Sequence, residues 1–331
     1  MNSRQDSETL APTKSSEQPS LGDYLSLARF DHVTKHVFII PGVVLAYMFA
    51  PSLVAFPILS IIIGFTSAIL IASGNYVINE WLDRSFDAFH PVKSQRPSVA
   101  RSLSPTLVYT EYLALIFAGL FLAYQIGGMF IAVAIAFVLS GVVYNVEPMR
   151  TKDKVYVDVI SESVNSPLRL ALGWTMVDPM SFPPISLLIA FWFGGAFLMT
   201  AKRLAEYRRA VAGESTQSLH LYRKSFRQYT TDNLTMACFL YAILSAFFIA
   251  VFLIKYRIEY LLAFPFVAAL FAMYFWLALQ PGTAVERPER LFKSRRLMLT
   301  SGLTVLAVIA ATFIDVPQLE QLSGPFIIDL R

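Results

Sequence analysis

The sequence predicts an all-α, polytopic membrane protein with about nine transmembrane helices. Of its 331 residues, 56% are hydrophobic and only 15% are charged, whereas soluble domains carry about a quarter charged residues. The apolar residues are grouped in blocks of about 18 to 25, the length at which a helix crosses the hydrocarbon layer. The single cysteine, Cys238, excludes an internal disulfide framework and is interpreted as a small packed apolar residue.

The predicted spans follow one another with short breaks that contain proline, glycine or charged residues. They cover residues 36–53, 56–80, 105–124, 127–145, 157–177, 184–203, 233–254, 258–279 and 297–315. Residues 1–25 are rich in Ser, Thr, Gln and Pro and are predicted to be a disordered tail. The first 30 residues contain no apolar signal-peptide core, so no signal peptide is expected. Residues 26–320 are predicted to form a single transmembrane domain.

The distribution of basic residues predicts the orientation in the membrane. Of the 27 Lys and Arg residues, 23 fall in the N-terminal tail and in the loops after the second, fourth, sixth and eighth spans. Because cytoplasmic loops carry an excess of Lys and Arg, we expect the N-terminus and these loops in the cytoplasm and the C-terminus outside the inner membrane. The same bias explains the net charge of +4, so no nucleic-acid partner is expected.

Four polar residues occupy one face of the second predicted helix where it leaves the membrane. They are Asn75, Asn79, Asp83 and Asp87, spaced four apart. Carboxylates one helical turn apart suit Mg²⁺, which prefers one or two carboxylates together with water and substrate phosphate oxygens. Lys93 and Arg96, which follow, could hold the same phosphates by charge-assisted hydrogen bonds. The alternative that this motif leaves open is a helix end marked by polar residues alone.

A second polar face enters the fifth predicted span. It contains Asp158, Glu162, Asn165 and Arg169. An Asp or Arg at mid-membrane costs roughly 2.5–3.5 kcal/mol, so these side chains are expected to face a cavity and partners. Pro167 should also open the backbone near Asn165 and leave a carbonyl available for a ligand. Structural pairing of Glu162 with Arg169 is the competing interpretation of those two residues.

The third element is TAKRLAEYRR, residues 200–209, at the end of the sixth span. Lys202 and Glu206 are one helical turn apart and could form an exposed salt bridge. They lie on the same predicted side of the membrane as the Asp-rich loop. A functional role of this element is therefore the second interpretation.

Together these elements resemble the UbiA superfamily of intramembrane transferases. The first family motif, N-D-x-x-D-x-x-x-D, reads NEWLDRSFD at residues 79–87, with Glu80 where the family most often has Asp. The second family motif runs from Tyr144 through Arg150 and Lys152 to Asp158. The resemblance covers about residues 25–315, and the paired motifs are specific.

The resemblance implies a bundle of helices around a central cavity and a transferase that acts on polyprenyl phosphate or diphosphate lipids. It implies Mg²⁺ bound by the motif residues Asn79, Asp83, Asp87 and Asp158, with the three Asp residues catalytic and the metal bridging a diphosphate. The residues implied to bind substrate phosphates are Lys93, Arg96, Tyr144, Arg150, Lys152, Glu162, Asn165, Arg169, Lys202 and Arg203.

Two branches of the family fit these motifs. Residues 87–97, DAFHPVKSQRP, are similar to the D-x-x-H-P-x-K-x-x-R-P run of the bacterial decaprenyl-phosphate phosphoribosyltransferases. Those enzymes join the ribose 5-phosphate of phosphoribosyl diphosphate to a polyprenyl phosphate and release diphosphate. The K-R-x-x-E element at 202–206 and Arg169 also match that branch. The alternative is an aromatic-acceptor prenyltransferase of quinone-type biosynthesis, which shares the Asp motifs and the Arg-Pro.

Two features depart from the phosphoribosyltransferase pattern, and one favours it. Asn165-Ser166 stands where that branch usually has Gly-Phe, and the loop before Asp158 is longer. Phosphoribosyl transfer involves a diphosphate, a 5-phosphate and a lipid phosphate, whereas prenylation of an aromatic acceptor involves one diphosphate. The motif loops contain more Lys and Arg than one diphosphate requires, although some of these serve only topology.

A transporter of lipids or small molecules is the alternative from another class. Transporters also have broken helices and polar groups within the membrane. In this sequence, however, the acidic motifs lie at the predicted cytoplasmic ends of helices rather than at the midplane, and their segments do not repeat. This placement favours chemistry on a diphosphate.

Overall fold

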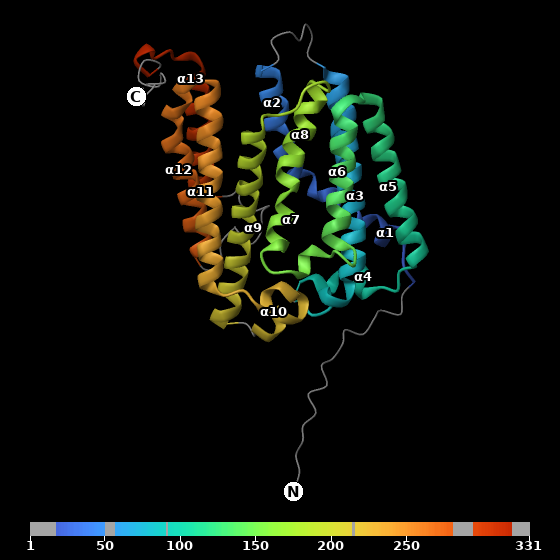
Figure 1. Ribbon diagram of the computed structural model, residues 1–331. Coiled ribbons are helices and arrows are strands. Elements are labelled where there is room, and N and C mark those ends of the chain that lie inside the picture. Colours follow the sequence, from blue (N-terminus) through green and yellow to red (C-terminus); the bar gives the residue numbers. More distant parts are fainter. Residues whose placement is uncertain (1–17, 50–56, 91, 214–215, 281–293, 320–331) are drawn as a thin grey trace, which may run out of the picture. The chain divides into compact units, whose positions relative to one another are not determined.

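The computed structural model describes residues 18–49, 57–90, 92–213, 216–280 and 294–319, and every regular element in these ranges is a helix (Figure 1). The α-helices are α1 Leu21–Leu27, α2 Ile40–Phe49, α3 Ile58–Asp87, α4 Pro97–Ala100, α5 Pro105–Ile126, α6 Gly128–Asn145, α7 Val157–Ser163, α8 Asn165–Val177, α9 Ile185–Gly213, α10 Thr216–Tyr222, α11 Thr231–Tyr256, α12 Phe264–Leu279 and α13 Arg295–Phe313. The 3₁₀-helices are η1 Phe30–Ile39, η2 Lys93–Gln95, η3 Thr151–Asp153, η4 Lys224–Arg227 and η5 Ile258–Ala263.

Among the described helices, seven are long and apolar enough to cross a membrane. They are α3, α5, α6, α9, α11, the continuous pair η5–α12, and α13. The predicted first span begins as the shorter apolar helix His36–Phe49, and its residues 50–53 lie outside the described residues. The predicted fifth span, 157–177, is divided into α7 and α8 at Val164. The all-helical, multi-pass prediction is therefore confirmed, while nine is only an approximate count.

The chain divides into two compact units, and the single transmembrane domain expected from the sequence stays a prediction. Unit 1 contains Met1–Asp158, Leu172–Ser181 and Ser215–Gln228. Unit 2 contains Val159–Ala171, Phe182–Glu214 and Tyr229–Arg331. The two Asp-rich motifs of the sequence both belong to unit 1, because its first segment ends at Asp158.

Unit 1 is built on α3, which packs against α5 and α6 (Figure 1). Small residues let α3 and α5 approach closely, as is common between membrane helices. The hydroxyl of Ser67 donates to the carbonyl oxygen of Gly119 at 2.7 Å. A Cβ added at Gly119 would lie 2.6 Å from Ile71 Cγ1 and 3.2 Å from the Ser67 carbonyl oxygen. The absence of a side chain at Gly119 therefore sets the distance between these two helices.

Asn75 fixes α6 against α3. Its Nδ2 donates to the carbonyl oxygen of Phe137 at 3.0 Å. Gly141 leaves the space that the Asn75 amide occupies, since a Cβ at that position would lie 2.2 Å from Asn75 Oδ1. This contact positions the end of α6, from which Tyr144 and the following basic loop extend.

The first helix of the described chain, α1, precedes the first long helix and is capped at Ser20. Ser20 and Asp23 form a capping box that starts α1, which satisfies backbone N–H groups at the helix start. Tyr24 accepts a hydrogen bond from the backbone N–H of Ser104 at 2.9 Å, and Leu27 packs in a core cluster with Trp81. Residues 21–25 are therefore helical, although they fall within the 1–25 tail that the sequence predicted to be disordered.

Unit 2 contains α9, α11, α12 and α13, which run alongside one another (Figure 1). The hydroxyl of Ser245 on α11 donates to the carbonyl oxygen of Ala190 on α9 at 2.9 Å. Phe197 is buried, and its ring centroid lies 5.2 Å from that of Phe271. At one end of this unit, Arg257 donates from Nε to the carbonyl oxygen of Ala311 at 3.1 Å and so binds the C-terminal end of α13.

Candidate functional site

The described part of unit 1 concentrates charged side chains where α3 ends. Asp87 is the last residue of α3 and is buried. Its carboxylate forms an ion pair with Arg96 Nη1 and lies 3.3 Å from Lys93 Nζ. His90 Nδ1 accepts hydrogen bonds from the backbone N–H groups of Val92 and Lys93, at 3.1 and 3.2 Å. This turn returns the chain towards Asp87, so Lys93 and Arg96 reach the carboxylate that the sequence predicted them to accompany. Pro91 lies outside the described residues.

The carboxylate of Asp83, one turn earlier on α3, binds the basic loop that follows α6. Its Oδ1 lies 2.9 Å from Arg150 Nη2 and 2.5 Å from Lys152 Nζ. Lys152 is 5% exposed, and its Nζ also donates to Asn145 Oδ1 at 2.8 Å. Burial lowers the pKa of Lys152 to about 8, against the opposing attraction of Asp83. The two sequence motifs therefore meet through these contacts.

Asp158 is fully buried at the start of α7. Ser225 Oγ donates to its Oδ2 at 3.0 Å, and Arg223 Nε lies 3.8 Å from the same oxygen. Arg223 Nη2 also donates to the hydroxyl of Tyr144 at 2.7 Å. Asp158 and Tyr144, both predicted from the second motif, are thus linked through Arg223.

The segment α10–η4 supplies site residues that the sequence interpretation missed. Besides Arg223 and Ser225, it contributes Lys224, whose Nζ lies 3.0 Å from Asp153 Oδ2 and 5.1 Å from the ring centroid of Phe86. Figure 1 shows α10 at the end of unit 1 where α3 finishes. From the sequence alone, these basic residues contribute only to the predicted orientation. Nothing in their spacing indicates that they contact a residue more than 60 positions away.

Glu80, which replaces the usual Asp of the family motif, is directed to the N-terminal segment and to α4. It is 3% exposed. Its partners are Arg29, Ser98 and Arg96. Asn79, which the sequence predicted as a metal ligand, is half-buried on α3.

Unit 2 has its own cluster of predicted residues. Arg203 is 2% exposed, and its Nη2 donates to Glu162 Oε2 at 2.8 Å. The Nη1 of the same arginine lies 3.6 Å from Glu206 Oε2. Glu162 is therefore paired with a residue of α9. Arg169 and Lys202 are half-buried within α8 and α9.

The helix break predicted near Asn165 occurs at Val164, between α7 and α8. At this break, backbone carbonyl groups leave the regular helical pattern, and side chains of unit 2 donate hydrogen bonds to them. Trp192 Nε1 donates to the carbonyl oxygen of Ile160 at 2.9 Å, and Asn165 Nδ2 donates to that of Glu162 at 3.0 Å. Asn165 thus has a backbone partner of its own at the break.

The carboxylate oxygens at the end of α3 are ligands that a hard cation prefers. Such a cation would need further ligands from water or substrate. Asp83 and Asp87 offer carboxylate oxygens one helical turn apart. Across the described ranges, no three His, Cys, Asp or Glu side chains are grouped closely enough to hold a metal ion. Mg²⁺ fits such a donor set, because it commonly takes one or two carboxylates and completes its shell with water and substrate phosphate oxygens.

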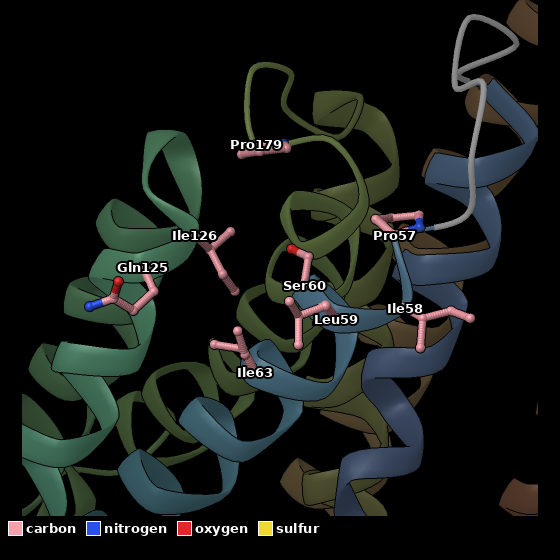
Figure 2. Close-up of a pocket in the computed structure, with 8 residues that line it drawn as sticks. All are labelled: Pro57, Ile58, Leu59, Ser60, Ile63, Gln125, Ile126 and Pro179. Atoms are coloured by element: carbon pink, nitrogen blue, oxygen red, sulfur yellow. The ribbon is translucent and has the colours of Figure 1, made fainter.

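A separate cavity of about 540 Å³ lies at the opposite end of α3 (Figure 2). It is lined mainly by apolar side chains, among them Ile58, Leu59, Ile63 and Ile126. At 1.5 Å per residue, the length of α3 separates it from Asp87 by roughly 40 Å. This cavity therefore takes no part in the charged cluster.

Long apolar helices and a charged cluster at the end of α3 indicate a multi-pass membrane protein. The model of the UbiA prenyltransferase family matches residues 38–313. The chain belongs to the UbiA prenyltransferase family.

Individual relatives are more distant. The chain is 31% identical over 150 residues to a protoheme IX farnesyltransferase of Geobacillus kaustophilus (strain HTA426), a match that covers 43% of this chain and 47% of that protein. It thus spans about half the length of this curated relative. Structures of a UbiA homolog from Archaeoglobus fulgidus, bound to DMAPP and Mg²⁺ or to GPP and Mg²⁺, each align with a TM-score of 0.65 at 19% identity. These alignments cover 88% of this chain and 100% and 98% of the two structures, and they establish a shared fold.

Proposed function

We propose that this protein is an intramembrane transferase that releases diphosphate with the help of Mg²⁺ and transfers phosphoribose from phosphoribosyl diphosphate to a polyprenyl phosphate. The observation that carries the proposal is the charged cluster of unit 1. In it the carboxylates Asp83, Asp87 and Asp158 each contact basic side chains from the motif loops or from α10–η4. Groups of both signs at one helix end suit a ligand that is a complex of a metal cation and a phosphate anion.

The acidic residues would hold the metal. Asp83 and Asp87 are the proposed ligands, with Asn79 one turn earlier on the same face of α3. No three carboxylates are grouped around one point in the described residues, so the metal role that the sequence predicts for Asp158 stays a prediction. When bound, Mg²⁺ would neutralise part of the charge on the leaving diphosphate. The relatives support this assignment, since the Archaeoglobus homolog was solved with Mg²⁺ and a prenyl diphosphate.

The basic residues would hold the phosphates. Lys93, Arg96, Arg150 and Lys152 are proposed to bind the diphosphate, because they already contact the two carboxylates of α3. Arg223 and Lys224 extend the basic cluster to Tyr144 and Asp153. These additional basic residues favour a donor that carries a second anionic group, such as the 5-phosphate of phosphoribosyl diphosphate.

The other residues proposed to bind substrate lie in unit 2 and are assigned from the motif. They are Glu162, Asn165, Arg169, Lys202 and Arg203. The ion pair of the buried Arg203 with the half-buried Glu162 gives these two residues a structural role that is independent of substrate.

The proposed reaction breaks the bond between ribose C1 and the diphosphate oxygen, and the electron pair leaves with diphosphate. An oxygen of the lipid phosphate forms the new bond to C1. Because that phosphate is already ionised, no proton needs to be abstracted, and the site requires no strong general base. The basic side chains would stabilise the charge that grows on the leaving group. We propose that this occurs on the cytoplasmic face of the inner membrane.

Prenylation of an acceptor is the second candidate, and the relatives favour it specifically. The bacterial relative is named a farnesyltransferase, and the Archaeoglobus structures contain DMAPP or GPP. Such a reaction would use the same carboxylates and diphosphate-binding residues. It would give Arg223 and Lys224 no second phosphate to bind.

The test is an assay of membranes that contain the protein with Mg²⁺, polyprenyl phosphate and phosphoribosyl diphosphate labelled in the ribose. We expect a labelled lipid and one released diphosphate per product. Asp83→Asn should lower this rate by about a hundredfold or more, since it removes a proposed metal ligand. A parallel assay supplies farnesyl diphosphate and an aromatic acid. A prenylated product there, without labelled lipid in the first assay, would contradict phosphoribosyl transfer. No product in either assay would favour a transporter.

A further inference from the structure

We propose that Glu80 is a positioning residue that fixes Arg96, and through it Asp87, for diphosphate binding, and that it is not a ligand of the metal. The inference rests on the proposed function only in that the site binds a metal diphosphate. It concerns the one position of the first motif where this chain departs from the family's usual Asp.

Both oxygens of the Glu80 carboxylate are engaged by the protein. Oε1 accepts a hydrogen bond from Ser98 Oγ at 3.2 Å. Oε2 accepts from Arg29 Nε at 3.0 Å and also pairs with Arg29 Nη2. The same Oε2 lies 3.7 Å from Arg96 Nε. The carboxylate is 3% exposed, and two of its donors, Arg29 and Ser98, are not among the residues proposed to bind diphosphate. These two contacts therefore do not depend on the substrate, whereas the partners of Asp87 are the proposed diphosphate ligands Lys93 and Arg96.

Arg96 connects Glu80 to Asp87. Its Nε faces Glu80, and its Nη1 donates to Asp87 Oδ2. The guanidinium group is planar and rigid, so carboxylates on two of its edges fix its orientation as well as its position. Glu80 therefore keeps an oriented donor beside the proposed metal ligand Asp87.

The extra methylene group of glutamate explains why this residue can reach Arg29. An Asp at position 80 would place its carboxylate about 1.5 Å closer to the α3 backbone. Arg29 lies between α1 and η1 with a φ of +48°, a conformation that non-glycine residues adopt only where their surroundings maintain it. The ion pair with Glu80 is one such constraint. The N-terminal segment thus becomes part of the support of the site.

The test uses purified full-length protein and makes two measurements. The first is the affinity for inorganic diphosphate at saturating Mg²⁺, and the second is the Mg²⁺ concentration at which diphosphate binding reaches half of its maximum. The variants are Glu80→Gln, which removes the charge, and Glu80→Asp, which keeps the charge but shortens the side chain. Asp87→Asn serves as the reference for a metal ligand. Arg257→Ala is the control for loss of an ion pair elsewhere, because it removes the pairs with Glu259 and Asp315 in unit 2.

We expect both Glu80 variants to weaken diphosphate binding by about tenfold to a hundredfold, as is usual when a residue that supports a metal ligand is changed. The Mg²⁺ requirement should change less than twofold, whereas Asp87→Asn should raise it strongly. Arg257→Ala should lower the unfolding temperature without changing diphosphate affinity. If Glu80→Gln does not fold, Glu80→Asp alone decides the question, since it retains the charge that Arg29 and Arg96 need.

Two results would overturn the inference. A rise in the Mg²⁺ requirement of the Glu80 variants that equals that of Asp87→Asn would make Glu80 a ligand. Unchanged diphosphate affinity together with a lower unfolding temperature would make its role structural only. Wild-type protein that binds no diphosphate at all would instead contradict the proposed function itself.

Discussion

At the scale of single residues, the cluster of unit 1 follows from the cost of burying charge. A buried carboxylate or ammonium without a partner is strongly unfavourable, so each must be paired and hydrogen-bonded. Asp83 meets this requirement with Arg150 and Lys152, and Asp158 meets it with Ser225 and Arg223. These pairs hold together loops that follow different helices. The contacts proposed to prepare the site for phosphate therefore also stabilise the fold.

Lys152 gives this cluster a measurable dependence on pH. Its pKa is about 8 in the folded protein and 10.5 for an ordinary lysine. Between these values the unfolded chain binds the proton more strongly, so the free energy of unfolding should rise with pH across that window, by up to about 3 kcal/mol. Below pH 8 the folded protein bears the full cost of the buried charge. Thermal unfolding of metal-free protein in detergent, followed from pH 7.5 to 10, measures this slope.

Lys152→Met is the matched variant for that measurement. It removes the titrating group, and Arg150 remains to pair with Asp83. We expect the variant to have a flatter pH dependence than wild-type protein over the same window. Equal slopes in the two proteins would assign the pH dependence to other groups.

At the scale of elements, the length of the apolar blocks predicted most of the helices. The four-residue spacing of Asp83 and Asp87 placed them on one helical face, because the helix continues beyond its apolar block. The sequence predicted residues 157–177 as one span, since hydropathy does not respond to a break. Pro167 indicated the break, but its place at Val164 depends on donors such as Trp192 on another helix. The contribution of α10–η4 could not be predicted either, because it depends on tertiary contacts between segments far apart in the sequence.

The close approach of α3 and α5 predicts opposite effects of the same substitution at two glycines. Gly119→Ala should destabilise the protein by about 1–3 kcal/mol, because the new Cβ would meet Ile71 and the backbone oxygen of Ser67. Gly302→Ala on α13 should be neutral or stabilising by up to about 1 kcal/mol, because in the described residues nothing beyond its own turn of helix lies within 4 Å of its Cβ position and alanine favours the helix. Unfolding temperatures of the two variants in one detergent provide the comparison. Equal shifts of the unfolding temperature in the two variants would show that the contact between α3 and α5 does not determine stability.

At the scale of the whole molecule, the predicted sides of the membrane differ in charge. Within unit 1, the end of α3 near Asp87 is surrounded by basic residues, whereas the cavity near Ile58 at the other end is lined mainly by apolar side chains. This asymmetry agrees with the bias of Lys and Arg among the loops, and it predicts a cytoplasmic site. Such a site could use a water-soluble, highly charged donor such as phosphoribosyl diphosphate, which does not cross a membrane unaided.

The orientation can be tested with single cysteines, because Cys238 is fully buried and can be replaced by serine. Lys154→Cys would report on the exposed loop near the site. Met180→Cys would report on the loop between α8 and α9, where Met180 is 84% exposed. In intact cells, a membrane-impermeant maleimide should label Met180→Cys. Lys154→Cys should react only after the membrane is permeabilised. The reverse pattern would place the charged cluster outside the cell, away from any cytoplasmic supply of donor, and would contradict the proposed orientation.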